Sequence, residues 1–396
     1  MKEGWTYKKL GDIATEMFRG SGIKRDQITI EGTPCVRYGE IYTTYNISFS
    51  ECFSHTNVEF ISSPKYFSHG DLLFAITGES VEDIGKTIAY LGHERCLLGG
   101  DIVCMKHNQN PKYLSYALSS SEAIRQKGIG KTKLKVVHTN IPALSEIRIP
   151  IPSLSEQQRI VSRLDAAFSH IDELKANAEK QLSEARALFQ KSLDKAMELK
   201  EGWKVKTLKE IGITQTGTTP SKSDLSNYGD FIPFIRPSEI DCDGCGSIDY
   251  NSEIKLSEKG LKNGRLFKKQ SILMVCIGAT IGKVGYCTQN VSCNQQINVL
   301  TPIKDNYKFI YYAMRNKDFN DKVIKGGTSA QATLPIINKG KWEVMTISLP
   351  SLSEQQRIVE RLDALSTHVR DLEENQKKII SECDALKQAL LRKVFE

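Results

Sequence analysis

Two long stretches of the chain repeat apolar residues with the period of an α-helix, and neither stretch contains Gly or Pro. They run from Leu154 to Lys200 and from Leu352 to Glu396. In each, the apolar residues recur at alternating steps of four and three, which is typical of helices that pair along an apolar seam. The predicted seam consists of Ile160, Leu164, Ala167, Ile171, Leu174, Ala178, Ala185 and Leu188 in the first stretch, and of Ile358, Leu362, Leu365, Val369, Leu372, Ile379, Cys383, Leu386 and Leu390 in the second.

Gln181 and Gln376 interrupt the predicted seam. A polar residue at such a position fixes the register of paired helices at some cost in stability. Counted from Ser155 to Leu199, the first helix would contain 45 residues and be roughly 67 Å long. This length favours a coiled coil. The alternative is two unrelated amphipathic helices that pack on one core.

Both stretches open with the same ten residues, Pro-Ser-Leu-Ser-Glu-Gln-Gln-Arg-Ile-Val, at 152–161 and again at 350–359. The spacing Ser-x-x-Glu after the proline predicts a helix capping box in each copy. Because the polar residues of this entry motif persist, we expect them to share one role, which is either capping and pairing of the helices or docking of the same partner twice. The candidates for partner docking and helix pairing are Glu156, Gln157, Arg159, Arg163, Leu174, Glu354, Gln355, Arg357, Arg361 and Leu372.

The repetition extends to the whole chain. Lys2-Glu-Gly-Trp5 returns as Lys200-Glu-Gly-Trp203, and this offset of 198 residues is also that of the entry motif and half of 396. Between these landmarks, short β-branched and aromatic runs separated by Gly, Pro, Asn and Asp indicate mixed, strand-rich α/β domains. The sequence therefore predicts an internal duplication in which globular domains alternate with long α-helices: domains at 1–150 and 200–348, and helices at 151–199 and 349–396.

Composition narrows the class of protein. No apolar run approaches the ~18 residues of a membrane span, and the first residues do not resemble a signal peptide, so we expect a soluble, cytoplasmic protein. The ten cysteines are scattered, which in a reducing compartment indicates free thiols. Cys242 and Cys245 have the spacing of half a zinc site, but no second pair matches it, and we expect no metal site.

Motifs of catalysis are nearly absent from the sequence. The Gly-Lys-Thr segments at 85–87 and 130–132 lack the first glycine of a P-loop, and no dinucleotide-binding glycine pattern follows a strand. Glu253-Ile-Lys255 matches the Glu-x-Lys of some nucleases, with Asp241 or Asp243 as an upstream metal ligand, but the other half has no counterpart. We therefore predict a non-catalytic protein. A stand-alone nuclease is an alternative that requires metal-dependent cleavage by the purified chain.

Positive charge is concentrated in the second globular half, where residues 200–350 contain 21 Lys and Arg against 14 Asp and Glu. A positive domain is the electrostatic footprint of a protein that binds a phosphate backbone. The best candidates for DNA contact are cations near glycines, whose amides can approach a phosphate, although each is equally compatible with a solvated loop. They are Arg125, Lys127, Lys131, Lys133, Lys135, Lys283, Lys322 and Lys325.

The duplicated arrangement resembles the specificity subunit of type I restriction–modification enzymes. Two diverged globular halves, each closed by the entry motif and a long helix, carry this resemblance over the whole chain. In the second half, Gly278-x-x-Ile-Gly-Lys283 and Asn294-Gln-Gln296 are similar to a recurrent pattern of the family's target recognition domains. The first half keeps Ile84-Gly-Lys86 but has Leu98-Gly-Gly100 in place of the second element.

The resemblance implies two target recognition domains separated by an antiparallel helical coiled coil, each reading one part of a bipartite duplex DNA target. It also implies two modification (methyltransferase) subunits that bind S-adenosylmethionine, and restriction/motor subunits that use ATP and Mg²⁺. This chain would itself hold no cofactor and contact no membrane.

The residues agree with this implication. Helices of roughly 67 Å would hold the domains far enough apart for half-sites about one turn of DNA from each other. The duplication would offer equivalent surfaces to two identical partners. The alternative function is a duplicated coiled-coil adaptor that binds only proteins, and salt-dependent, sequence-selective binding to duplex DNA would distinguish the two.

Overall fold

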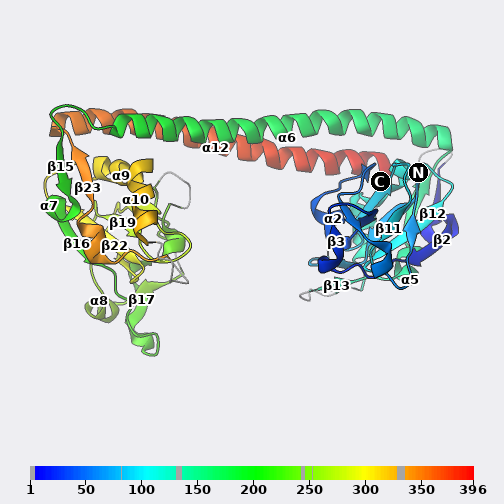
Figure 1. Cartoon of the computed structure of the whole chain (residues 1–396), viewed down its shortest axis with the longest axis horizontal. Coiled ribbons are helices and arrows are strands. Elements are labelled where there is room, and N and C mark those ends of the chain that lie inside the picture. Colours follow the sequence, from blue (N-terminus) through cyan, green and yellow to red (C-terminus); the bar gives the residue numbers. More distant parts are fainter. Residues whose placement is uncertain (1–4, 82, 131–135, 242–245, 252, 328–334) are drawn as a thin grey trace. The chain divides into compact units, whose positions relative to one another are not determined.

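The computed structural model describes residues 5–81, 83–130, 136–241, 246–251, 253–327 and 335–396. The chain forms two compact units (Figure 1), of which unit 1 comprises Met1–Asn177 with Ile379–Glu396 and unit 2 comprises Ala178–Lys378. Each unit therefore contains one globular domain, the first half of one long helix and the second half of the other.

The domain of unit 1 contains strands β1 (Thr6–Lys9), β2 (Ala14–Arg19), β3 (Ile28–Thr29), β4 (Thr33–Val36), β5 (Ser48–Phe49), β6 (Ser54–Thr56), β7 (Tyr66–Phe67), β8 (Leu72–Ala75), β9 (Thr77–Gly78), β10 (Thr87–Tyr90), β11 (Cys96–Leu98), β12 (Ile102–His107), β13 (Val137–His138) and β14 (Arg148–Ile151). Its helices are α1 (Leu10–Ile13), α2 (Tyr38–Thr43), α3 (Pro111–Leu118), α4 (Ser121–Lys127) and α5 (Ile141–Ser145), with 3₁₀ turns η1 (Arg25–Gln27) and η2 (Val58–Phe60). The strands form two five-stranded sheets, β2-β12-β8-β10-β5 and β3-β6-β4-β11-β7, and the ladders β1-β14 and β13-β9.

The domain of unit 2 contains strands β15 (Lys204–Thr207), β16 (Gly212–Thr216), β17 (Tyr228–Ile235), β18 (Lys255–Leu256), β19 (Ile272–Val275), β20 (Val284–Tyr286), β21 (Ser292–Cys293), β22 (Ile297–Pro302) and β23 (Thr346–Leu349). Its helices are α7 (Leu208–Ile211), α8 (Glu258–Asn263), α9 (Tyr307–Arg315), α10 (Lys317–Gly327) and α11 (Lys339–Glu343), with 3₁₀ turns η3 (Leu225–Asn227) and η4 (Pro237–Glu239). The sheets β16-β22-β19-β20 and β18-β17-β21 and the ladder β15-β23 repeat the plan of unit 1. The predicted mixed, strand-rich α/β fold is confirmed.

One inner strand of each domain, β8 in unit 1 and β19 in unit 2, is buried on both faces, so its sequence is continuously apolar rather than alternating. All four residues of β8 are buried, and so are all four of β19. Leu72 and Phe74 contribute to one core of unit 1, whereas Leu73 and Ala75 contribute to the core on the opposite face. The period of two along a strand thus divides each domain into two cores, one on each side of the sheet.

The two predicted long helices are present as α6 (Leu154–Met197) and α12 (Leu352–Phe395), each of 44 residues. In unit 1, Lys175 binds Asp384 at 2.9 Å and Asp172 binds Lys387. In unit 2, Arg186 binds Glu373 at 2.6 Å and Gln376 donates to Gln181 at 3.0 Å. Because residue numbers rise on one helix as they fall on the other, the helices are antiparallel in both units.

In the predicted seam, one of the two lines of residues is correct, whereas the other is buried at the start of each helix, at Ile160 and Ile358, and is wrong further along. Ile171, Ala178, Val369 and Cys383 are buried as predicted. The leucines of the second line are exposed instead, and Leu174 and Leu372 keep 56% and 37% of their surface; the other exposed members are Leu188, Ile379 and Leu386.

Charged residues explain this error. The position after each exposed leucine belongs to the seam, and at three of these positions the residue is Lys175, Glu373 or Lys387. Their charges are neutralised by ion pairs across the helices, so that they cover the seam with their aliphatic stems. A search for apolar residues therefore selects the neighbouring leucine, one position too early.

The end of each helix completes the core of a globular domain. Leu391 and Phe395 of α12 are buried in unit 1, where Phe395 packs edge-on against Tyr113 of α3. The residues that stand 198 positions earlier, Leu193 and Met197 of α6, are buried in the main core of unit 2. Among the described residues, no helix is long and apolar enough to cross a membrane.

Candidate nucleic-acid interface

A polar cleft of about 990 Å³ opens in unit 1 where β2, β4 and β11 end. Its charged lining residues are Arg19, Arg25, Arg37, Glu40 and Asp101. Three cations against two acids give the cleft a positive balance. The guanidinium of Arg19 donates to Gly100 O at 2.5 Å and to the Asp101 carboxylate at 2.6 Å, which fixes it at the rim.

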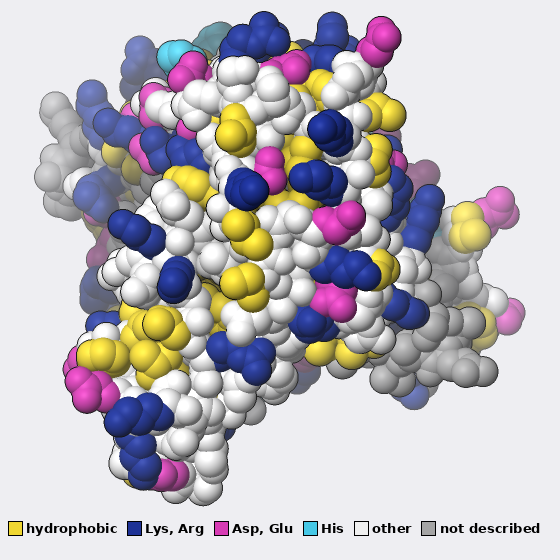
Figure 2. Space-filling model, turned by 90° about the vertical axis from the view of Figure 1, so that its left-hand side faces the viewer, with side chains coloured by type: hydrophobic (Ala, Val, Ile, Leu, Met, Phe, Trp, Pro, Cys, Tyr) yellow, Lys and Arg dark blue, Asp and Glu magenta, His cyan; other side chains and the backbone are white. Residues whose placement is uncertain are grey.

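A second polar cleft, of about 700 Å³, opens in unit 2 beside β17, β18 and β21. Its charged lining residues are Lys222, Asp230, Arg236, Glu253 and Lys255, and the amides of Asn294, Gln295 and Gln296 line it as well. This cleft again combines three cations with two acids, and it adds three side-chain amides. On the side of the molecule drawn in Figure 2, where β15, β23 and α7 lie, Lys and Arg side chains are spread widely among fewer Asp and Glu.

The same close backbone contact lies beside both clefts. Gly20 N donates to Ile102 O at 2.9 Å, and Gly217 N donates to Ile297 O at 3.0 Å. A Cβ on either glycine would lie 2.1 Å from a carbonyl oxygen, that of Gly99 or that of Asn294, so only glycine fits. The clefts are therefore one feature of the fold that occurs in both copies.

A buried glutamate holds an arginine at each cleft. Glu40 and Glu239 are each 5% exposed. The carboxylate of Glu40 accepts a bond from Arg37 Nε at 3.1 Å, and that of Glu239 accepts a bond from Arg236 Nη2 at 2.6 Å. Sequence reasoning missed both pairs. The signal was present, because Arg-Tyr-Gly-Glu-Ile at 37–41 matches Arg-Pro-Ser-Glu-Ile at 236–240.

The loop that follows β11 or β21 differs in chemistry between the clefts. Gly99 N donates to Val36 O at 2.9 Å and Asn294 N donates to Ile235 O at 3.1 Å, so these two residues are equivalent. The amides at 294–296 thus correspond to Gly99-Gly100-Asp101, one residue later than the Leu98-Gly-Gly segment singled out in the sequence. A common backbone frame therefore carries different hydrogen-bonding groups in the two domains.

The prediction that Lys127 contacts DNA is wrong. Its side chain is buried, and its Nζ donates to Leu118 O at 2.8 Å and to Thr87 Oγ1 at 3.1 Å. Burial lowers the pKa of Lys127 from 10.5 to about 7. The lysine therefore joins α4 to β10 inside the domain and is not accessible to a phosphate.

The other predicted cations lie at several places. Arg125 and Lys322 are exposed but already paired, with Glu122 and with Asp318, each at 2.7 Å. Lys325 is exposed on α10, and Lys283 is half-buried next to β20. None of these four lines either cleft. Lys131, Lys133 and Lys135 lie outside the described residues, and their role stays a prediction.

The first of the two glutamines in the entry motif is buried and joins each long helix to its domain. Gln157 is fully buried; its amide nitrogen donates to Pro152 O at 2.9 Å and to Gln109 Oε1 at 2.8 Å, and its oxygen accepts from Asn110 N at 3.0 Å. In unit 2, Gln355 repeats this arrangement with Pro350 O, Asp305 and Asn306 N at 3.1, 2.8 and 2.9 Å.

A carboxylate about two helical turns later strengthens the same junction. Asp165 accepts bonds from Lys112 Nζ at 2.6 Å and Tyr116 OH at 2.8 Å, both on α3. Asp363 accepts bonds of the same lengths from Lys308 and Tyr312 on α9. The repeated polar residues Gln157, Gln355, Asp165 and Asp363 thus anchor the domain on its helix.

The remaining polar residues of the entry motif face outward. Glu156 pairs with Arg159 at 2.6 Å and Glu354 pairs with Arg357 at 3.7 Å. Ser153 and Ser351 accept bonds from the amides of Glu156 and Glu354 at 3.4 and 3.3 Å, as expected of helix caps. Arg163 and Arg361 are exposed. These residues are accessible to a partner, whereas Gln157 and Gln355 are not.

Comparisons with known proteins agree with this duplicated architecture. The family described as the type I restriction modification DNA specificity domain matches residues 2–184 and again residues 200–382. A putative type I restriction enzyme specificity subunit of Methanocaldococcus jannaschii, MjaX, is 26% identical over 388 residues, which cover 92% of this chain and 87% of the relative.

Solved structures show the same fold. One, described as the structural basis of complex assembly and conformational transition of a type I R-M system, has a TM-score of 0.78 at 20% identity and covers 99% of this chain and 98% of its own. The HsdS subunit of Thermoanaerobacter tengcongensis has a TM-score of 0.54 at 18% identity, with 100% and 97% covered.

Two strand-rich domains with equivalent polar clefts, each anchored to a long helix, define a duplicated recognition protein. This chain belongs to the type I restriction modification DNA specificity family, with one copy of the domain in each half. The predicted family is confirmed. The family is described by DNA specificity and its relatives as specificity subunits, in agreement with the prediction of a non-catalytic specificity subunit.

We expect Gln157→Ala to destabilise unit 1 by about 2–4 kcal/mol, because the substitution leaves a buried N–H and a buried C=O without their partner. Gln158→Ala is the matched control: Gln158 is exposed and accepts one bond, from the Asn110 side chain. This control should cost less than about 1 kcal/mol. Thermal denaturation of both variants tests the anchor, and equal melting temperatures would contradict it.

The buried Lys127 predicts a pH-dependent stability. Between pH 7 and 10.5 the unfolded chain carries a proton on Lys127 that the folded chain does not, so the free energy of unfolding rises with pH in this window. Relative to Lys127→Met, the wild-type chain should gain on the order of a few kcal/mol from pH 7 to 10. Denaturant unfolding at several pH values measures the difference. Parallel stability curves for the two proteins would contradict the buried, neutral lysine.

Proposed function

We propose that this chain is the DNA sequence-specificity subunit of a type I restriction–modification complex, in which each domain reads one half of a bipartite duplex target. The observation that carries this proposal is the pair of clefts. The glycine contact beside them and the arginine held by a buried glutamate are the same in both units, whereas the other side chains around them differ. Evolution of two copies of one domain toward different DNA segments would keep the backbone and change the side chains in this way.

The chemistry of the clefts suits DNA better than a protein partner. Arg, Lys, Asn and Gln are the side chains that hydrogen-bond to phosphates and to base edges. Five charged side chains line each cleft, and three amides line the second, whereas the core of a protein–protein interface is depleted of charge. A duplicated adaptor that binds only proteins is therefore not favoured.

The rest of the complex follows from the family. Specificity subunits of type I systems assemble with other restriction–modification subunits and bind DNA. We infer two modification subunits for this chain, which bring S-adenosylmethionine, and restriction/motor subunits, which use ATP and Mg²⁺. Because the substrate is cellular DNA, the complex would work in the cytoplasm.

Two equivalent apolar surfaces support two identical modification subunits. In unit 1, Leu174 and Leu386 are exposed at the same level of the helix pair, set by the Lys175–Asp384 ion pair. Each of these leucines comes one residue before a seam position of its own helix. In an antiparallel pair, residues that precede seam positions on the two helices lie on the same side of the pair. The duplication places Leu188 and Leu372 in the same way in unit 2, beside the Arg186–Glu373 ion pair. Each leucine pair can receive an apolar helix of one partner copy.

The leucine pairs can be tested separately. Leu174→Ser combined with Leu386→Ser should leave the melting temperature nearly unchanged, because both side chains are exposed. It should reduce the number of bound modification subunits from two to one, measured as the mass of the complex. Leu225→Ser, at another exposed leucine, is the control. A variant that still binds two subunits would remove the leucine pair from the interface.

A domain exchange tests the function itself. Replacing residues 6–150 with the equivalent domain of a relative should change one half of the methylated DNA sequence in cells that express the chain with its modification subunit. The other half and the spacer should stay the same, because the second domain and the helices are untouched. Sequencing of methylated sites provides the measurement, and a change in both halves would contradict the model of two independent readers.

A further inference from the structure

Gln295 occupies a distinctive place in the cleft of unit 2. Its neighbours hold each other: Asn294 Nδ2 donates to Gln296 Oε1 at 2.9 Å, and Gln296 N donates to Asn294 Oδ1 at 3.1 Å. Both neighbours are half-buried, whereas Gln295 between them is exposed and lines the cleft. The loop therefore has a fixed backbone that presents one amide.

Thr219 sets the orientation of that amide. Its hydroxyl donates to Gln295 Oε1 at 2.5 Å. The oxygen of the amide is thus engaged, and the NH₂ group is the part that is left to bind a ligand as a donor. Thr219 lines the same cleft and belongs to the same loop as Lys222, which lines it too.

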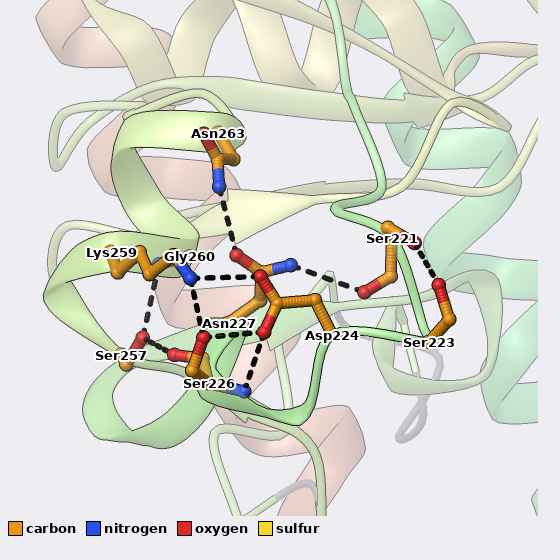
Figure 3. A network of polar contacts seen from close by, with 9 residues as sticks. All are labelled: Ser221, Ser223, Asp224, Ser226, Asn227, Ser257, Lys259, Gly260 and Asn263. Atoms are coloured by element: carbon orange, nitrogen blue, oxygen red, sulfur yellow. Dashed lines mark hydrogen bonds and ion pairs between the residues drawn. The ribbon is translucent and has the colours of Figure 1, made fainter.

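The loop that carries Thr219 and Lys222 is braced against α8 (Figure 3). Asp224 binds Lys259 at 2.8 Å, and Asn263 Nδ2 donates to Asn227 Oδ1 at 2.9 Å. The bond from Lys259 lowers the pKa of Asp224 to about 2, so this pair stays charged at neutral pH. Asn227 in turn donates from Nδ2 to Ser221 O at 3.1 Å.

A close contact and a serine pair complete the brace. A Cβ at Gly260 would lie 1.8 Å from Asn227 O, so α8 and the loop meet there without a side chain between them. Ser221 and Ser223, the neighbours of Lys222, are bonded to each other at 2.7 Å. The backbone that presents Lys222 is thus fixed before any ligand arrives, which reduces the entropy lost on binding.

The two groups that these loops present to the cleft, the ammonium of Lys222 and the NH₂ group of Gln295, are hydrogen-bond donors. The acids of the cleft have cationic neighbours: Glu239, behind the cleft, holds Arg236 at 2.6 Å, and Asp230 lies 3.6 Å from Lys255. Glu253 faces Arg236, whose pKa is raised chiefly by its bond with Glu239 and also by the charge of Glu253. A rigid site with an ammonium and an oriented amide NH₂ group suits an anion with several acceptor oxygens.

We propose that Lys222 and Gln295 bind one phosphate of the DNA backbone and thereby position the second recognition domain on the duplex without reading a base. The inference rests on the proposed function and concerns one domain. In unit 1 the residue equivalent to Gln295 is Gly100, which has no side chain, and the cleft is served by arginines instead. Phosphate contacts set register and orientation, and base contacts elsewhere in the domain supply the sequence.

The two residues predict different responses to salt. Lys222→Ala removes a cation and its released counterion, so the slope of log K against log salt should shrink by about 0.9 in magnitude. Gln295→Ala removes a neutral donor, so binding should weaken about tenfold at every salt concentration with an unchanged slope. Thr219→Val should weaken binding in the same way, but less, because Gln295 is then free to rotate. In all three variants the methylated DNA sequence should be that of the wild type.

The test uses the full chain assembled with its modification subunits. Fluorescence titrations with a target duplex and a non-target duplex at four salt concentrations give the slopes, and sequencing of methylated sites gives the target. Lys204→Ala is the matched control, since Lys204 is an exposed lysine of the same domain that does not line the cleft. Melting temperatures equal to that of the wild type show that each variant folds.

Each outcome has a definite meaning. An unchanged slope for Lys222→Ala, or a slope that changes as much for Lys204→Ala, overturns the phosphate contact. A methylated sequence altered in one half by Gln295→Ala overturns it as well and makes Gln295 a base reader. If the wild-type complex binds target and non-target duplexes equally, the proposed function fails. If the wild-type complex prefers the target duplex but the three variants bind DNA as the wild type does, only this inference is refuted.

Discussion

The architecture depends on a buried glutamine at the start of each long helix. Gln157 and Gln355 lie in the protein interior, and every hydrogen-bonding group of their amides has a partner in the adjoining domain or in the turn before the helix. A buried amide with all its partners present tolerates little displacement, because each lost bond leaves an unsatisfied group. The direction in which the helix leaves the domain is thereby fixed in both copies.

This anchor allows the domains to diverge. The sheets, the glycine contact beside the cleft and the buried glutamate that holds an arginine are repeated in both units. They determine where the loops after β2, β4 and β11 and after β16, β17 and β21 emerge. The exposed side chains on those loops that line the clefts contribute less to stability than the buried ones, so they can change more freely. One frame can therefore present arginines in one domain and amides with a lysine in the other.

Charge has two separate roles in the chain. On the helices, ion pairs such as Lys175–Asp384 and Arg186–Glu373 cross the seam and select the antiparallel register. In the clefts, cations remain partly exposed and are available to DNA. The type of a residue alone therefore does not show whether it is accessible to DNA. Lys127 and Lys222 both stand in polar segments, yet Lys127 is buried in the first domain and Lys222 lines the cleft of the second.

The sequence by itself determined the features that depend on local or repeated patterns: the duplication at 198 residues, the two capped helices, the mixed α/β domains and the family. Only the tertiary structure decided which side of each helix faces its partner, because Lys175 and Glu373 become seam residues only through partners on the other helix. The clefts were likewise beyond sequence reasoning. Arg37 and Gly99 are brought together by the pairing of β4 with β11, and Arg236 and Asn294 by the pairing of β17 with β21. These strands are distant in the chain, so no local sequence pattern predicts the contacts.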